Sequence, residues 1–245
     1  MKLYHFPEPQ GEPDGVRLVP SQEDMMQVIE TAMAKNGIGL IVTAHGCGKS
    51  SVFDHCLDTI PGAAGVTGSP VKNTPSAMLS QLCGAFQTYP ADRSAARLEE
   101  MVCNAIKWAR DPVLLIDEAQ RYPFRCLDEL RCIHDLTRVP LVIAGNHSLH
   151  GRLSTGGTSD YAPIASRIVA KFVLDASTPA DMGALAAQFG LSDRKAVSWL
   201  GERCIGTGNL RMASDLLASA RDMASPGEIQ LSHLKAAAAI RGAGK

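Results

Sequence analysis

One segment, residues 43–50 with the sequence Thr-Ala-His-Gly-Cys-Gly-Lys-Ser, constrains the fold of this chain more than any other. A short apolar run at residues 38–42 precedes it and indicates a buried strand, and a helix is expected at residues 49–59. A glycine-rich turn between a strand and a helix is typical of a phosphate-binding loop, because backbone N–H groups and the helix dipole both face the anion. The segment therefore predicts a nucleotide site on an α/β fold.

The side chains that follow the glycines suit a triphosphate with its metal. Lys49 would reach the β- and γ-phosphates of ATP, and the Ser50 hydroxyl would bind Mg²⁺. The usual first glycine of this pattern is replaced by Thr43. The alternative is a glycine-rich turn followed by an unrelated Lys-Ser pair, but the flanking strand and helix favour the phosphate loop. The other residues expected to contact the nucleotide here are His45, Gly46, Cys47, Gly48 and Ser51.

A pair of acids, Asp117 and Glu118, ends the apolar run at residues 113–116. If this strand neighbours the strand before the loop in a parallel sheet, Asp117 points toward the phosphates. There it would bind the nucleotide's Mg²⁺, and Glu118 would orient and deprotonate the attacking water. Solvated acids at a strand end are the alternative for the pair taken alone. A glutamate that activates water favours hydrolysis over transfer to a small molecule, as in a kinase.

Three more polar residues are candidates for contacts to the γ-phosphate. Asn146 follows the apolar run at residues 141–144 and could bond the γ-phosphate or the water, although a Gly-Asn turn is the alternative. Arg167 and Arg152 lie in the connection before the last expected strand. Either could be an arginine finger that reaches a neighbouring subunit's site.

The order of apolar segments predicts an α/β core followed by helices alone. Strands are expected at residues 38–42, 64–67, 113–116, 141–144 and 172–174. Because each is a continuous apolar run, we expect a parallel five-stranded sheet flanked by helices. We divide the chain into an extended lead-in at 1–20, an α/β core at 21–175 and a helical lid at 176–245. The first lid helix should be capped by Thr178 and end at Gly190.

One arginine of the expected lid is a further candidate. Arg211 begins a helix after a Gly-Asn pair and lies off that helix's apolar face. It could reach back to the γ-phosphate. The alternative is an ion pair with Asp215, which lies one helical turn further on.

Composition narrows the class of protein. No apolar run approaches the roughly 20 residues of a membrane helix, and the N-terminus lacks the apolar stretch of a signal peptide. The seven cysteines form no CxxC pair, which favours reduced thiols in the cytoplasm over disulfides or zinc. The net charge is -1, so any contact with nucleic acid must be local or multiplied by oligomerisation.

The order of these motifs resembles that of AAA+ ATPases with a P-loop core and a small C-terminal helical lid. The stretch Leu114-Leu-Ile-Asp-Glu-Ala-Gln120, with 127–131 (Leu-Asp-Glu-Leu-Arg) and 142–145 (Val-Ile-Ala-Gly), is similar to the MuB/TnsC group of transposition regulators. Residues 161–168 resemble the finger region of its MuB branch. The resemblance covers residues 16–220. Seven positions match the group's motifs: Lys49, Ser50, Asp117, Glu118, Asn146, Arg167 and Arg211.

The resemblance implies a function as well as a fold. It implies that ATP drives assembly into a helical filament on duplex DNA, and that the filament delivers target DNA to a MuA-like transposase. Hydrolysis would then control disassembly, in the cytoplasm of the host cell if a phage encodes the chain. The phosphate loop begins by residue 43, so we expect a relative without the N-terminal DNA-binding module of the phage Mu type. A secretion ATPase similar to ExeA is the alternative within the fold, and a small-molecule kinase is the alternative outside it.

The resemblance also implies where DNA would bind. In related filaments the segment between the second strand and the Asp-Glu strand grips the duplex. Here the candidates are Lys72, Asn73, Thr74, Thr88 and Arg93. Thr74 alternatively only caps the helix that begins at Pro75. One weak phosphate contact per subunit is repeated along a filament, and no base-reading helix is evident, so binding should be largely independent of sequence.

Overall fold

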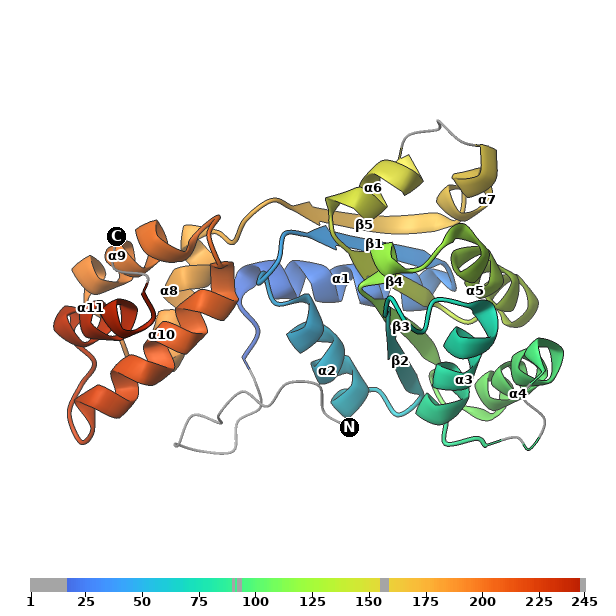
Figure 1. Cartoon of the computed structure of the whole chain (residues 1–245), viewed down its shortest axis with the longest axis horizontal. Helices are drawn as coiled ribbons and strands as arrows, with labels where there is room; N and C mark the ends of the chain where they lie inside the picture. The colour runs from blue at the N-terminus through green and yellow to red at the C-terminus, as the bar shows by residue number, and fades with distance from the viewer. Residues whose placement is uncertain (1–16, 90, 92–93, 155–158, 243–245) are drawn as a thin grey trace. The chain divides into compact units, whose positions relative to one another are not determined.

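The computed structural model describes residues 17–89, 91, 94–154 and 159–242, and its contacts divide the chain into two compact units (Figure 1). We call them the α/β unit and the helical unit. The α/β unit is formed by residues 24–43 and 49–173. The helical unit is formed by residues 174–245, the loop 44–48 and the segment that ends at Glu23. None of the helices in the described part of the chain has the length and apolar character needed to cross a bilayer.

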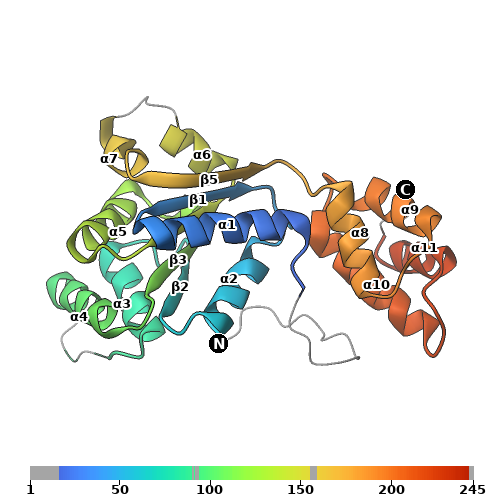
Figure 2. The same cartoon turned by 180° about the vertical axis from the view of Figure 1, so that it is seen from behind.

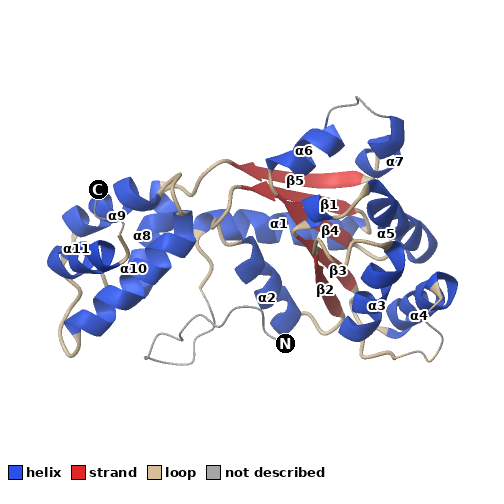
Figure 3. Cartoon of the chain, in the orientation of Figure 1, coloured by secondary structure: helices blue, strands red, loops and turns tan. Residues whose placement is uncertain are grey.

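The α/β unit is built on one parallel sheet (Figure 3). In sheet order its strands are β2 (Ala63–Thr67), β3 (Val113–Asp117), β4 (Leu141–Gly145), β1 (Ile38–Thr43) and β5 (Ile168–Leu174). The pairings β2–β3, β3–β4 and β4–β1 are all parallel. β5 runs the same way, because the N–H of Ile38 bonds the carbonyl of Arg167 while that of Ala44 bonds the carbonyl of Leu174. The five-stranded parallel sheet is therefore confirmed.

The strand order corrects one expectation. β1 and β3 are not neighbours, because β4 lies between them. All three strands are fully buried and parallel, so their carboxyl ends meet at the same edge of the sheet. The end of β4, which Asn146 follows, thus lies between the ends of β3 and β1 at that edge.

Helices cover both faces of the sheet. Successive side chains of a strand point to opposite faces, and on one face Ile38, Leu40 and Val42 join a core with apolar residues of α3, α4 and α5. On the other face Gly39 lies against Val28 and Ala32 of α1, which Figure 2 shows in front of β1. The helices of this unit are α1 (Pro20–Lys35), α2 (Lys49–Thr59), α3 (Pro75–Ala85), α4 (Ala95–Trp108), α5 (Phe124–Thr137), α6 (His147–Ser154) and α7 (Ala162–Ala165).

The last strand differs most from its expectation. β5 begins at Ile168, not at residue 172. Its side chains alternate between half-buried and exposed, and Val169 and Val173 are among the exposed ones. A strand at the edge of a sheet does not need apolar side chains on both faces, so only its more apolar end was visible as a continuous run. The short helices α6 and α7 were not expected either, since neither is long enough to show a periodic pattern.

The helical unit holds its own apolar core. Its helices are α8 (Pro179–Gln188), α9 (Arg194–Cys204), α10 (Asn209–Ala224) and α11 (Leu231–Ile240). α8 begins with the expected cap, because the Thr178 hydroxyl accepts the N–H of Asp181 and the Asp181 carboxylate accepts the N–H of Thr178. The same carboxylate accepts the N–H of Ser21 at 2.8 Å. Within the helical unit, one buried side chain thus joins Ser21 to the start of α8.

We expect Thr178→Ala to destabilise the helical unit by about 1 kcal/mol, because one helix cap is lost. The two tryptophans, Trp108 and Trp199, lie in α4 and α9, one in each unit. In a Trp108→Phe background, urea unfolding followed by Trp199 fluorescence reports on the helical unit. The control is Ser232→Ala, an exposed serine of α11, which should leave the midpoint unchanged or slightly raised. Equal midpoints for Thr178→Ala and its parent would contradict the expectation.

Candidate functional site

Four polar residues of the α/β unit meet where β1 ends and α2 begins. The Lys49 ammonium donates to the Thr43 hydroxyl at 2.9 Å and to the Thr43 carbonyl at 3.3 Å. The Ser50 hydroxyl donates to the Asp117 carboxylate at 2.7 Å. Lys49, Thr43 and Asp117 are all buried. The structure thus brings the Lys-Ser pair of the loop to the acid of β3, although these strands are two places apart in the sheet.

The replacement of the first loop glycine has a structural result that the sequence pattern did not reveal. A threonine at position 43 supplies a hydroxyl that a glycine lacks, and this hydroxyl holds the Lys49 ammonium. A buried ammonium requires such acceptors, because its desolvation is otherwise costly. Thr43 is therefore compatible with the loop and adds a side-chain partner for its lysine.

Glu118 is held in an unusual backbone conformation. Its φ of 51° and ψ of 35° lie in the left-handed region, which costs a non-glycine residue about 1–2 kcal/mol. The conformation is supported locally, since the Glu118 N–H donates to the Asp117 carboxylate at 2.7 Å. The Asp117 carbonyl in turn accepts the N–H of Gly68 at 2.8 Å, just after β2. Strain of this kind recurs at functional sites, where surrounding contacts hold it in place.

Two residues that the sequence analysis did not single out contact the Glu118 carboxylate. Both come from the short 3-10 helix η1 (Ala119–Arg121). The Gln120 amide donates to Glu118 Oε2 at 2.9 Å, and the Arg121 guanidinium pairs with the same oxygen at 3.1 Å. The only signal in the sequence was their place directly after the Asp-Glu pair.

Asn146 caps the helix that follows it. Its side-chain oxygen accepts the N–H of Ser148 at 3.0 Å and the Ser148 hydroxyl at 2.7 Å. Its own N–H donates to the Gln120 amide oxygen at 3.3 Å. The turn expected as the alternative is thus present, and it leaves the residue at the carboxyl end of β4. A contact from Asn146 to a phosphate stays a prediction.

Two carbonyl groups of the loop 44–48 accept hydrogen bonds from the start of α10, within the helical unit. Gly46 and Gly48 both have positive φ, and a side chain at Gly46 would collide with the Gly208 carbonyl. The Gly46 carbonyl accepts the N–H of Arg211 at 3.1 Å, and the His45 carbonyl accepts the Asn209 amide at 3.0 Å. The start of α10 is thus bonded directly to this loop.

Asp215, the alternative partner suggested for Arg211, pairs with Arg241 of α11 at 2.7 Å. The hydrogen bond from Arg211 to the loop comes from its backbone N–H. A role of its side chain at a γ-phosphate stays a prediction.

Both finger candidates bind groups of their own chain. The Arg167 guanidinium holds the Asp135 carboxylate with two hydrogen bonds, at 2.6 and 2.8 Å. The Arg152 guanidinium donates to the Tyr122 carbonyl at 3.0 Å and lies 6.0 Å from the centre of the Tyr161 ring. Arg167 keeps about a third of its side chain exposed.

The DNA candidates fall into two places. Lys72, Asn73 and Thr74 lie together before α3, and the Thr74 hydroxyl accepts the N–H of Ala77, so it does cap the helix. Thr88 lies beyond the other end of α3, where its hydroxyl donates to a carbonyl of the helix end. An 11-residue helix is about 16 Å long, so the two places are not one cluster. Arg93 lies outside the described residues.

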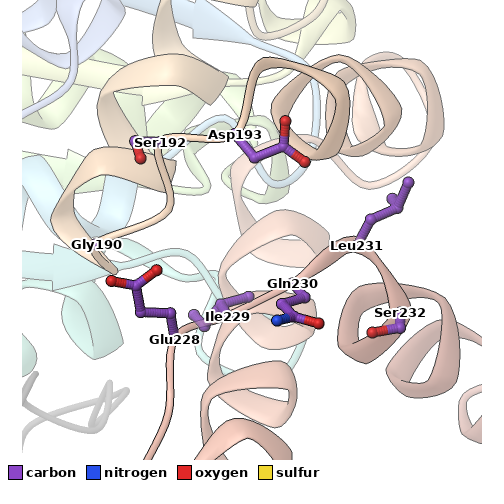
Figure 4. A pocket seen from close by; sticks show the side chains of 8 residues that line it. All are labelled: Gly190, Ser192, Asp193, Glu228, Ile229, Gln230, Leu231 and Ser232. Carbon is purple, nitrogen blue, oxygen red and sulfur yellow. The ribbon is translucent and has the colours of Figure 1, made fainter.

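A depression in the helical unit, drawn in Figure 4, has a structural explanation. Its lining is Gly190, Ser192, Asp193, Glu228, Ile229, Gln230, Leu231 and Ser232. Two of its polar side chains serve helix ends, because Asp193 accepts the N–H of Lys195 at the start of α9 and Gln230 caps α11. We assign it no ligand.

Comparison with known proteins adds to this geometry. Residues 32–153 match the model of a family described as AAA domain. The chain is 25% identical over 202 residues to the DNA transposition protein B of the Mu-like prophage FluMu of Haemophilus influenzae. The aligned segment covers 81% of this chain and 70% of that protein. It is 29% identical over 106 residues to the ATP-dependent target DNA activator B of Escherichia phage Mu, a match that spans 43% of this chain and 34% of that protein.

These matches support a MuB-like AAA+ ATPase. Solved structures support the fold. The ADP form of the ORC2 protein of Aeropyrum pernix aligns with 94% of the chain and 70% of its own length, at a TM-score of 0.65 and 16% identity. The RuvB branch migration motor of Thermotoga maritima aligns with 90% of the chain and 68% of its own, at a TM-score of 0.56 and 18% identity.

The ion pair of Arg167 makes stability depend on pH. Hydrogen bonds from Arg167, and a further one from Arg131, lower the pKa of the Asp135 carboxyl. A lowered folded-state pKa stabilises the fold above the unfolded pKa of about 4, and this contribution is lost as the pH falls through the folded pKa. Asp135→Asn should therefore cost stability near neutral pH, and the difference from the parent should shrink below about pH 4.

Urea midpoints measured by circular dichroism at several pH values test this. Asp128→Asn is the matched control, because Asp128 lies on the same helix and pairs with Arg131, whereas the carboxylate that Arg167 binds is that of Asp135. A gap between parent and Asp135→Asn that stays constant with pH would contradict the assignment.

Proposed function

We propose that this protein is an ATP-dependent activator of target DNA in transposition, which assembles into filaments on duplex DNA and releases it after hydrolysis. The observation that carries the proposal is the 2.7 Å contact between Ser50 and Asp117, with the buried Lys49 ammonium beside it. The names of the two relatives, a DNA transposition protein B and an ATP-dependent target DNA activator B, supply the biological context. A transposase similar to MuA is the proposed partner.

The oxygen groups of Ser50 and Asp117 fit a magnesium ion. A hydroxyl and a carboxylate that already lie 2.7 Å apart offer the hard oxygen donors that Mg²⁺ prefers. Mg²⁺ held by these two side chains would offset the negative charge of the phosphates. Lys49 would exchange the Thr43 hydroxyl for phosphate oxygens, and the N–H groups of residues 45–51 would bind the remaining phosphate oxygens.

Glu118 is the proposed general base. It follows Asp117 directly, and its carboxylate is about one-fifth exposed, so a water molecule can reach it. It would orient that water and accept its proton, while Asn146 would bond the γ-phosphate or the same water. The chain's own residues thus provide metal ligands, charge stabilisation and a base.

Assembly would complete the site and create the DNA grip. We propose that Arg167 leaves Asp135 in the assembled state and reaches the neighbouring subunit's γ-phosphate, with Arg152 as the alternative finger. Lys72 and the N-terminus of α3 would contact DNA phosphates. Because the chain's net charge is only -1 and each contact is weak, affinity would come from repetition along the filament.

Negative-stain microscopy with ATP, with and without duplex DNA, tests the function. The parent should form helical filaments on DNA that disappear as ATP is consumed. Glu118→Gln should bind ATP but keep its filaments on DNA, because the base is lost and hydrolysis stops. Subunits that hydrolyse ATP but stay monomeric and indifferent to DNA would favour an ATPase of another machine, such as one for secretion. Hydrolysis by Glu118→Gln at the parent rate would remove the base assignment.

The finger is tested by Arg167→Ala, which should lower hydrolysis about 10³-fold. Arg131→Ala is the matched control, because it also removes a partner of Asp135 but not the candidate finger. Mixing Arg167→Ala with Glu118→Gln subunits should restore part of the activity, since the second variant supplies the finger to an intact catalytic site of the first. A loss of only a few-fold in Arg167→Ala would transfer the role to Arg152.

A further inference from the structure

Gln120 occupies the space between the proposed base and the end of β4. Its amide nitrogen donates to Glu118 Oε2 at 2.9 Å, and its amide oxygen accepts the N–H of Asn146 at 3.3 Å. A carboxamide has a donor and an acceptor on one planar group, so it can serve both partners at once. The two contacts also fix which way the amide points.

Gly145 leaves the room that this arrangement needs. A Cβ at position 145 would lie 2.5 Å from the Gln120 amide oxygen and 2.8 Å from a methyl carbon of Leu149. A carbon atom does not approach an oxygen or another carbon so closely unless one of them moves. Any side chain at position 145 would therefore displace the Gln120 amide or Leu149. The glycine before Asn146 is thus explained by close approach rather than by backbone conformation.

The contacts also select one oxygen of the base. Gln120 and Arg121 both bind Oε2 of Glu118. Among the residues that the structure describes, none donates a hydrogen bond to the other oxygen, Oε1. The carboxylate is therefore held by one oxygen while the second can accept a hydrogen bond from water.

We propose that Gln120 is a positioning residue, which ties the Glu118 carboxylate to the carboxyl end of β4 so that Oε1 faces the attacking water. Through the same amide, a movement of Asn146 on contact with the nucleotide is transmitted to Glu118. The role rests on the proposed function, because it requires Glu118 to be the base. It differs from a structural role in that the hydrogen-bonding groups of the amide matter, not only its volume.

Three variants separate these roles. Gln120→Ala removes both contacts and should lower kcat for ATP hydrolysis about tenfold or more, with the KM for ATP within about twofold, because a displaced base affects the chemical step and not binding. Gln120→Glu keeps the size but replaces the amide donor of the Glu118 contact by a carboxylate oxygen, so kcat should fall as in Gln120→Ala while KM stays within about twofold. Gly145→Ala should reproduce the kcat effect of Gln120→Ala.

The matched control is Gln81→Glu. Gln81 is also half-buried in the α/β unit, but its amide donates to the Tyr122 hydroxyl. The same substitution at that position should leave kcat and the KM for ATP unchanged. The charged groups in contact with Glu118 are Arg121 and Asp117, and neither is altered by any of these variants.

The outcomes separate the role of Gln120 from the proposed function on which it rests. If the parent hydrolyses ATP, Glu118→Gln does not, and Gln120→Ala and Gln120→Glu keep the parent's kcat, the Gln120 role is overturned and the function stands. If the parent hydrolyses no ATP, the function is overturned. The contact itself is read by NMR, where the Gln120 side-chain amide resonances, assigned by their loss in Gln120→Ala, should shift in Glu118→Gln. Unmoved resonances would overturn the inference independently of activity.

Discussion

The meeting of three strand ends at one edge of a parallel sheet is the constraint on which the rest of the α/β unit depends. β1, β4 and β3 are buried over their whole length and run in the same direction, so the chain leaves all three at the same edge. This is why Ser50, Asn146 and Asp117 come together from positions spread over about a hundred residues. An antiparallel β3 would carry Asp117 to the opposite edge and remove its bond with Ser50.

The residues between these strand ends form one connected polar network rather than a set of separate side chains. Ser50 bonds Asp117, Asp117 bonds the backbone of Glu118, and Gln120 joins Glu118 to Asn146. Partly buried hydrogen bonds of this kind strengthen one another and are costly to leave unmade. The left-handed backbone of Glu118 persists because its neighbours on both sides are fixed in this way.

Most features that the sequence predicted correctly follow from local patterns of residues. The bounds of α2 and the caps at Thr74 and Thr178 follow from the types of single residues, so they could be read directly. The strand order could not, because every apolar run suits any position in a parallel sheet. Contacts between distant residues were equally hidden: Arg167 and Asp135 are 32 residues apart, and nothing in either local sequence indicates the other.

The contact between Gln120 and Glu118 was missed for a different reason. The two residues are only two positions apart in the sequence, and side chains at that spacing do not face each other on a regular helix. They meet here because Glu118 adopts the left-handed conformation and turns the chain into η1. A pattern that assumes regular backbone cannot reveal such a contact.

The candidate DNA contacts of this nearly neutral chain carry little positive charge. The two described groups of candidate contacts lie at opposite ends of α3, about 16 Å apart, and one hydroxyl of each is already used to bond the backbone at a helix end. What remains for phosphates is chiefly the exposed Lys72 and backbone N–H groups. Such a surface has too little charge to retain a duplex as a single subunit, whereas subunits ordered along the duplex add their contacts at high effective concentration. Assembly and DNA binding would then be one event, and the ATP site that controls the first would control the second.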